Sequence, residues 1–204
     1  MNFKSILSLS FFYSLLQRIT SKKTALNFTN KFYNVKSKSK VIDIGCGPGA
    51  MLKRLNPTID YLGIDVSTKY INSAKKKFGR KARFYCGSIS DFIYDQDFKN
   101  TDVIICNCML HHLDDVEIGK LFSFVKYNIK SGTGRFLSIE PTHLIYEGGI
   151  SKWFMNRDRG EYVRTEAVWK KILEECNPNA LIKTQVATAL SRLPYIYLLI
   201  EINY

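Results

Sequence analysis

The sequence has little of what would bind a metal ion or build a disulfide framework. Its 204 residues include five cysteines and three histidines. The cysteines form no C-x-x-C pair and no Cys/His ligand spacing, so we expect no metal site. Because most of them lie in apolar surroundings, we expect reduced, buried thiols, as in a cytoplasmic protein. These thiols are Cys46, Cys86, Cys106, Cys108 and Cys176.

Acidic residues are also few: 18 Asp and Glu face 30 Lys and Arg, which leaves a formal net charge of +12. Such an excess can indicate a nucleic-acid partner. The basic runs at residues 36–40, 75–77 and 80–83 are rich in lysine and lie in expected linkers and on helix faces. Solvated charge, an anionic small substrate or a phospholipid surface fits them equally well. RNA therefore stays an alternative partner.

No apolar run is long enough to cross a bilayer. The most apolar stretch, residues 3–16, is too short to span and lacks a small-x-small cleavage site. We expect a helix there that covers the sheet, and no transmembrane segment. Basic residues on both sides of it leave peripheral membrane contact as an alternative.

From residue 40 onwards, short apolar runs alternate with helical patterns. This alternation predicts an α/β fold, with a parallel sheet and helices on both faces. The expected strands are 40–44, 60–64, 82–86, 102–107 and 134–139, followed by a terminal hairpin of 181–188 and 195–202. The expected helices are 7–18, 23–32, 50–55, 68–78, 115–129 and 166–176.

The most informative motif is VIDIGCGPGA at residues 41–50. An apolar strand containing Asp43 leads into three glycines, Gly45, Gly47 and Gly49. Glycines adopt positive φ and let backbone N–H groups approach a ligand closely. A helix at 50–55 would add unpaired N–H donors at its first turn. This arrangement is how proteins hold a nucleotide-like cofactor, and the sequence has no P-loop motif that would favour a nucleotide hydrolase.

About twenty residues further on, Asp65 ends the next expected strand. Its two carboxylate oxygens can accept hydrogen bonds from both hydroxyls of a ribose. The alternative is that Asp65 merely begins the following helix. Ser67 is already a good N-cap for that helix, so we favour the ribose interpretation.

These blocks resemble the class I S-adenosylmethionine (SAM)-dependent methyltransferases, of the small bacterial type with an LHHL motif. The resemblance continues through RFYCGSISDF from Arg83, TDVIICNCMLHHLDD from Thr101 and GTGRFLSIEP from Gly132. It implies a Rossmann-like, doubly wound sheet of seven strands, mostly parallel with one antiparallel strand near the C-terminus. It also implies SAM as cofactor and methyl transfer to an oxygen or carbon of a small molecule.

Within one domain spanning 1–204, we expect four parts. These are an N-terminal helical cap (1–39), a SAM-binding core (40–141), a lid or substrate insertion (142–165), and a C-terminal helix with a β-hairpin (166–204). A monomer or a homodimer fits this organisation.

The resemblance also assigns the cofactor site. Val66 would contact the adenine edge and the loop at Ser88 would hold the adenine, although many relatives have an acid where Ser88 stands. Asp91 could compensate for that absence. The backbone carbonyl of Asn107 would face the methionyl amine. The full expected cofactor set is Asp43, Gly45, Cys46, Gly47, Asp65, Val66, Ser88, Ile89 and Asn107.

Two histidines in the LHHL motif are candidate general bases, because the pKa of histidine lies near neutrality. His112 is the stronger candidate and His111 the weaker one, with a structural role as the alternative for either. The connection 142–165 carries candidate substrate contacts that suit an anionic or planar molecule. An Arg–Asp bridge that pins this loop is the alternative. The expected substrate residues are Tyr13, Trp153, Arg157, Arg159 and Tyr162.

Other functional classes fit less well. A dehydrogenase would need a G-x-G-x-x-G turn and a second domain. A nucleic-acid amino-methyltransferase resembles its relatives in a proline-rich motif after the fourth strand, and residues 107–110 contain no proline. An RNA methyltransferase and a catalytically inactive SAM-binding protein stay as alternatives.

Overall fold

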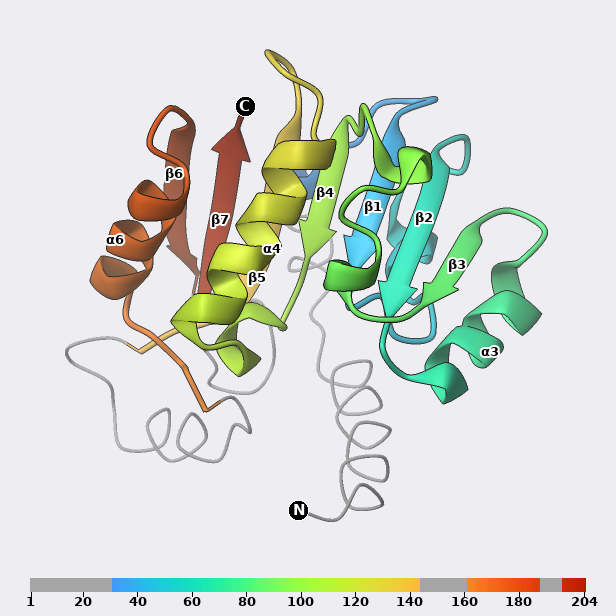
Figure 1. Cartoon of the computed structure of the whole chain (residues 1–204), viewed down its shortest axis with the longest axis horizontal. Coiled ribbons are helices and arrows are strands. Elements are labelled where there is room, and N and C mark those ends of the chain that lie inside the picture. The colour runs from blue at the N-terminus through green and yellow to red at the C-terminus, as the bar shows by residue number, and fades with distance from the viewer. Residues whose placement is uncertain (1–30, 144–160, 188–195) are drawn as a thin grey trace.

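A seven-stranded sheet with helices on both faces forms the centre of the molecule (Figure 1). The computed structural model describes residues 31–143, 161–187 and 196–204. The predicted helix 7–18, nearly all of the predicted helix 23–32 and most of the predicted lid lie outside these residues.

The predicted sheet is confirmed. Its strands lie in the order β3-β2-β1-β4-β5-β7-β6. All pairs among the first five strands are parallel, whereas β7 is antiparallel to both β5 and β6. The strands are β1 (Lys40–Ile44), β2 (Asp60–Asp65), β3 (Arg83–Cys86), β4 (Val103–Cys106), β5 (Arg135–Pro141), β6 (Leu181–Ala187) and β7 (Tyr197–Asn203).

Helices cover the sheet because successive strand residues point to opposite faces. In β1, Ile42 and Ile44 join one apolar cluster and Val41 joins the other. The first cluster includes side chains of α4 (Asp115–Asn128) and α6 (Glu166–Cys176), which lie on the same side of the sheet in Figure 1. The second includes side chains of α3 (Thr68–Phe78) and Tyr33.

The helix starts follow the sequence closely. Ser67 caps α3, and Thr165 caps α6 by accepting from Val168 N. At α4, Asp114 and Glu117 form a reciprocal capping box, which satisfies two backbone donors of the first turn. Three further short 3-10 helices are η2 (Ile89–Asp91), η3 (Gln96–Phe98) and η4 (Leu110–His112).

The predicted helix at 50–55 is wrong in type and length. The chain forms only a four-residue 3-10 helix, η1 (Met51–Arg54), and no side chain caps its start. Leu55 is already extended, with φ −96° and ψ 165°. The chain therefore has no α-helical first turn at this point, and the glycine turn becomes the more important source of backbone donors.

All five cysteines are free thiols, but their burial differs from the prediction. Cys46 and Cys106 are buried, whereas Cys86 is exposed. Cys86 ends β3, which is the edge strand of the sheet. An edge strand has no neighbour on one side, so its last residue reaches solvent.

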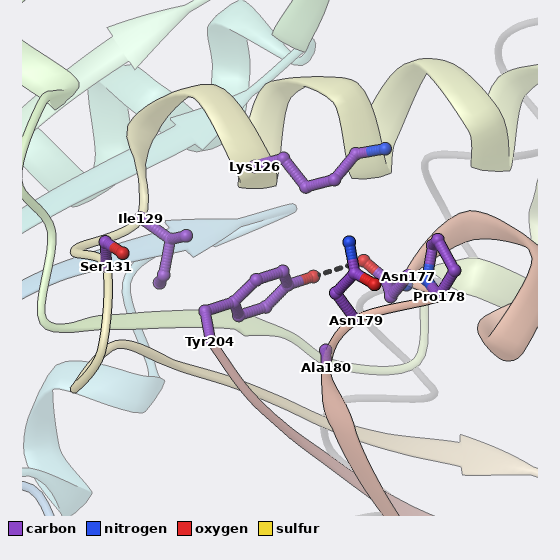
Figure 2. A pocket seen from close by; sticks show the side chains of 8 residues that line it. All are labelled: Lys126, Ile129, Ser131, Asn177, Pro178, Asn179, Ala180 and Tyr204. Atoms are coloured by element: carbon purple, nitrogen blue, oxygen red, sulfur yellow. Dashed lines mark hydrogen bonds between the residues drawn. The ribbon is translucent and has the colours of Figure 1, made fainter.

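A hollow of about 390 Å³ lies where α4, α6 and β7 end (Figure 2). Its polar side chains already bond to the protein: Tyr204 Oη donates to Asn177 Oδ1 at 2.5 Å, and Lys126 Nζ donates to the carbonyl of Cys176 at 3.1 Å. The parallel strands begin at this end of the sheet, whereas ligands of such folds bind at their carboxyl ends. We therefore place the functional site at the opposite end of the parallel strands, where their carboxyl ends lie.

Candidate functional site at the carboxyl ends of the parallel strands

The glycine turn after β1 has the backbone that its sequence predicts. Gly45, Gly47 and Gly49 all have positive φ, at 70°, 53° and 77°. Gly45 N and Cys46 N both donate to the carbonyl of Ile64, at 2.9 and 3.0 Å, which fixes the turn to β2. A Cβ on Gly45 would lie 2.9 Å from Met109 Sδ, whereas a Cβ on Gly47 would meet nothing within 4 Å. The turn is packed on one side and open at Gly47, where a ligand has room.

Asp65 joins this turn to the end of β2. Its Oδ2 accepts from Gly47 N at 2.9 Å and its Oδ1 accepts from Ser67 N at 2.8 Å. Burial raises the pKa of Asp65, and these two hydrogen bonds oppose that rise. Each carboxylate oxygen can accept a second hydrogen bond, so the carboxylate keeps capacity for two hydroxyls of a ligand.

Asp43 lies deeper, with its carboxyl 3% exposed. The hydroxyl of Tyr61 donates to Asp43 Oδ2. Burial raises the pKa of Asp43 to about 7, and the hydrogen bond from Tyr61 limits the rise. Gly63 pairs with Asp43 in the ladder, and a Cβ there would lie 2.8 Å from both Cys46 Sγ and Phe84 Cδ1.

The loops after β2 and β3 offer an apolar contact and a capped turn. Val66 directly follows β2 and is 74% exposed, so its side chain is available to contact a flat ring. In the neighbouring loop, Ser88 N donates to Asp91 Oδ2 at 2.8 Å within a capping box. Gly87 N donates to the carbonyl of Asp65, which holds the loop beside β2. Ile89 packs partly against the core, and Asp91 holds its own loop.

The segment that follows β4, residues 107–112, is called the tail of β4. It is held by the fully buried carboxyl of Glu140 on β5. Glu140 accepts from Met109 N at 3.1 Å and from His111 N at 3.4 Å, and Ser138 Oγ donates to it at 2.9 Å. His111 Nδ1 lies 2.7 Å from Glu140 Oε2. The backbone N–H groups of Met109 and His111 can only donate, whereas the Ser138 hydroxyl also lies at the carbonyl of Cys106. The Glu140 carboxyl therefore fixes the backbone that carries both histidines.

The two histidines differ in environment although their ring centroids lie only 4.1 Å apart. His111 is 3% exposed, whereas His112 is exposed. A general base must reach its substrate, so this difference favours His112 over His111 for that role. His111 instead has the surroundings of a residue that holds the loop.

Both ends of the connection between β5 and α6 lie beside this tail. Thr142 Oγ1 donates to the carbonyl of Arg164 at 2.9 Å, and Tyr162 N donates to the carbonyl of His111 at 3.0 Å. Arg164 Nη2 lies 2.7 Å from Asp115 Oδ1 at the start of α4. An Arg–Asp bridge of the kind considered for this segment is therefore present between Arg164 and Asp115, whereas Arg157 and Arg159 lie outside the described residues.

The described members of the predicted site thus lie at or near the carboxyl ends of the parallel strands. Tyr162, 38% exposed, lies at the backbone of His111. Tyr13, Trp153, Arg157 and Arg159 lie outside the described residues. The sequence reasoning missed the roles of Tyr33 and Tyr61, whose hydroxyls contact Asn107 and Asp43.

Among residues 31–143, 161–187 and 196–204, no group of three His, Cys, Asp or Glu side chains converges as a metal site. No helix in these ranges has the length and apolar character needed to cross a membrane.

Comparison with known proteins agrees with this geometry. Residues 41–132 match the family model of a methyltransferase domain. No curated protein matches the chain. The matched range covers the glycine turn, Asp65, the β4 tail and α4, whereas Tyr33, β5 and the connection lie outside it.

Solved structures share the fold at low sequence identity. A SAM-dependent methyltransferase from Aquifex aeolicus superposes with a TM-score of 0.62 at 18% identity, over 88% of this chain and 89% of that one. Geranyl diphosphate C-methyltransferase from Streptomyces coelicolor, solved with Mg²⁺, geranyl diphosphate and S-adenosyl-L-homocysteine, gives 0.66 at 14%, over 88% and 79%. Mitomycin 7-O-methyltransferase gives 0.67 at 16%, over 89% of this chain and 53% of its own.

Proposed function

We propose that this chain, which has the fold of the class I SAM-dependent methyltransferases and a methyltransferase-domain sequence over residues 41–132, transfers a methyl group from SAM to an oxygen or carbon atom of a small molecule. The observation that supports this most strongly is the joint geometry of Gly47 and Asp65. An open backbone position and a carboxylate with spare acceptor capacity lie 2.9 Å apart, at the edge of the sheet where ligands of such folds bind.

The described residues fit the separate parts of this cofactor. Asp65 suits the ribose hydroxyls, and the exposed Val66 with the loop at Ser88 suits the adenine. Asp43 and Asn107 would serve the methionyl end, where an ammonium group needs acceptors. Bound SAM supplies the reactive methyl group on its sulfonium, which a nucleophile can displace directly.

The protein's part in such a displacement is mainly positioning and the exclusion of water. The fixed tail of β4 would hold the acceptor beside the cofactor. His112, exposed at the end of η4, would remove a proton from an acceptor hydroxyl. The Glu140 carboxyl holds the backbone of this tail but does not face the acceptor. Tyr162 and the connection 142–165 would bound the acceptor pocket.

The reported relatives include one that methylates a carbon and one that methylates an oxygen. Both have small-molecule names, which supports a small-molecule acceptor here. An RNA acceptor is the second candidate, favoured by the net charge of +12. The absence of a proline-containing motif in residues 107–110 counts against the RNA base amino-methyltransferases.

Binding of SAM can be measured by titration calorimetry. We expect micromolar-scale affinity for the unchanged protein. Replacing Asp65→Ala should weaken binding about tenfold or more, because the acceptor for the ribose is lost.

Asp97→Ala is a suitable control. This variant also loses an aspartate that accepts hydrogen bonds, from Tyr85 and Arg83, but at a surface position on η3. It should bind SAM as the unchanged protein does. No detectable SAM binding, or tight NAD binding in its place, would overturn the proposal.

A further inference from the structure

The tail of β4 leaves the sheet in an unusual way. The ladder between β4 and β5 ends at the pair Ile105 and Leu137. Beyond it, the side chain of Asn107 accepts from Ile139 N at 3.1 Å, and Cys108 N donates to the carbonyl of Ile139 at 3.0 Å. Cys108 has φ 48°, in the left-handed region. The Asn107 side chain thus accepts the hydrogen bond from Ile139 N on β5. In a continuing ladder, a backbone carbonyl of β4 would accept it.

This arrangement determines which way the Asn107 amide faces. A backbone N–H can only donate, so the atom that faces Ile139 N must be the oxygen Oδ1. The hydroxyl of Tyr33 donates to the same oxygen at 3.0 Å. Both lone pairs of Oδ1 are then used. Within the described part of the chain, Nδ2 has no protein acceptor. It stands on a half-buried residue at the carboxyl end of β4.

Burial and hydrogen bonds to the neighbouring backbone hold Tyr33 in place. It is 3% exposed and packs in the same apolar cluster as Val41 and Leu137. Arg135, at the start of β5, donates to the carbonyls on either side of it, Phe32 O at 3.4 Å and Asn34 O at 3.5 Å. Burial raises the pKa of Tyr33 well above its usual value, so its hydroxyl stays a donor.

We propose that Tyr33 is a positioning residue for methyl transfer: by holding Asn107 Oδ1 it aims the Asn107 amide donor and the adjoining backbone at the methionyl end of the cofactor. An N–H donor there fits the cofactor's carboxylate. This inference rests on the proposed function. It gives the segment that precedes β1 a direct part in the geometry of the site.

The chain offers a closely matched control. Tyr204 also donates its hydroxyl to an asparagine oxygen, Asn177 Oδ1, but at the opposite edge of the sheet (Figure 2). Tyr33→Phe and Tyr204→Phe each remove one such hydrogen bond and keep the ring. Urea unfolding should show a similar small loss of stability for both variants.

Only Tyr33→Phe should weaken SAM binding, by about fivefold or more in titration calorimetry, as expected for one lost orienting hydrogen bond. Equal SAM affinity in the two variants would mean that Tyr33 contributes packing alone and would overturn the proposal.

A double-mutant cycle tests the route through Asn107. In an Asn107→Ala background, the further change Tyr33→Phe should leave SAM affinity nearly unchanged, because the side chain that Tyr33 aims is gone. An undiminished fivefold effect in that background would show that Tyr33 acts by another route. If the unchanged protein binds no SAM at all, the proposed function fails first, and that outcome is distinct from these.

Discussion

At the scale of single residues, we expect the buried carboxyl of Asp43 to link proton binding to ligand binding. Its pKa of about 7 lies above the reference value of 3.8, because burial disfavours the charged form. The folded protein therefore holds this proton more tightly than the unfolded chain. The stability contributed by this group is fully present below pH 3.8 and is lost as the pH rises to about 7.

A cationic ligand should have the opposite dependence on pH. SAM carries a sulfonium and an ammonium, and these favour the ionised carboxylate. We expect SAM affinity to increase by up to about tenfold per pH unit until pH 7 and then to level off. Calorimetry at pH 6 in two buffers of different ionisation enthalpy should detect proton release on binding.

Asp43→Asn isolates this effect, because an amide oxygen can still accept from Tyr61 but does not titrate. Its SAM affinity should be lower and nearly independent of pH between about 5.5 and 8, a range that brackets the Asp43 pKa of about 7. A pH dependence that survives in this variant would assign the titrating group elsewhere.

The residue contacts of the site were the part hardest to predict from sequence. The glycines and Asp65 could be recognised because their spacing along the chain is itself the signal. Tyr33 and Tyr61 could not, since a tyrosine in an apolar run predicts only burial. Their hydroxyl partners depend on which strands become neighbours, and that is decided by the assembled sheet.

At the scale of elements, η4 contains two adjacent histidines with different expected roles. His111→Ala would remove a partner from the fully buried carboxyl of Glu140 and should cost about 3 kcal/mol of stability or more in urea unfolding. His112→Ala, at an exposed position, should change stability by less than about 0.5 kcal/mol.

For turnover, we expect the change at His112 to have the large effect. With its acceptor, His112→Ala should lose about a hundredfold or more in turnover if the histidine is the base, while SAM affinity stays nearly unchanged. Full turnover in this variant would leave η4 with a purely architectural role.

Most element boundaries could be predicted from sequence, and the exceptions have local causes. α3 and α6 match the predicted ranges because each has a side-chain cap and a clear apolar face. The failure at 50–55 follows from Pro57: the residue before a proline avoids the helical region, which leaves too few residues after Gly49 for a stable α-helix. β4 ends one residue early because the Asn107 side chain takes over its hydrogen bonding.

At the scale of the whole molecule, the positive charge is concentrated near α3. Between Asp65 and Asp91 the chain contains no acidic residue. Among the described residues, six cations there form no ion pair, and five of them lie at or just beyond the C-terminal turn of α3, where cations favour the helix dipole. These six are Lys69, Lys75, Lys76, Lys77, Arg80 and Lys81.

This charge should give non-specific rather than specific binding to RNA. We expect weak binding to tRNA at low salt that falls steeply as salt increases, as for simple phosphate contacts. Fluorescence anisotropy with tRNA and with an unrelated RNA of equal length, over a series of salt concentrations, measures this. A tight complex with one RNA only would favour the RNA acceptor over a small molecule.

The order of strands has a consequence for how the chain is made. β7 is the last strand in the sequence, yet it lies inside the sheet, between β5 and β6 (Figure 1). A ribosome releases β5 and β6 before β7, so a nascent chain carries an apolar β5 edge and an unpaired β6 until residues 197–203 emerge. The proposed ligand site lies at the carboxyl ends of β1 to β5, which are synthesised earlier. A growing chain could therefore shape its ligand site before its sheet is closed, and early binding of the cofactor would then favour the native arrangement during synthesis.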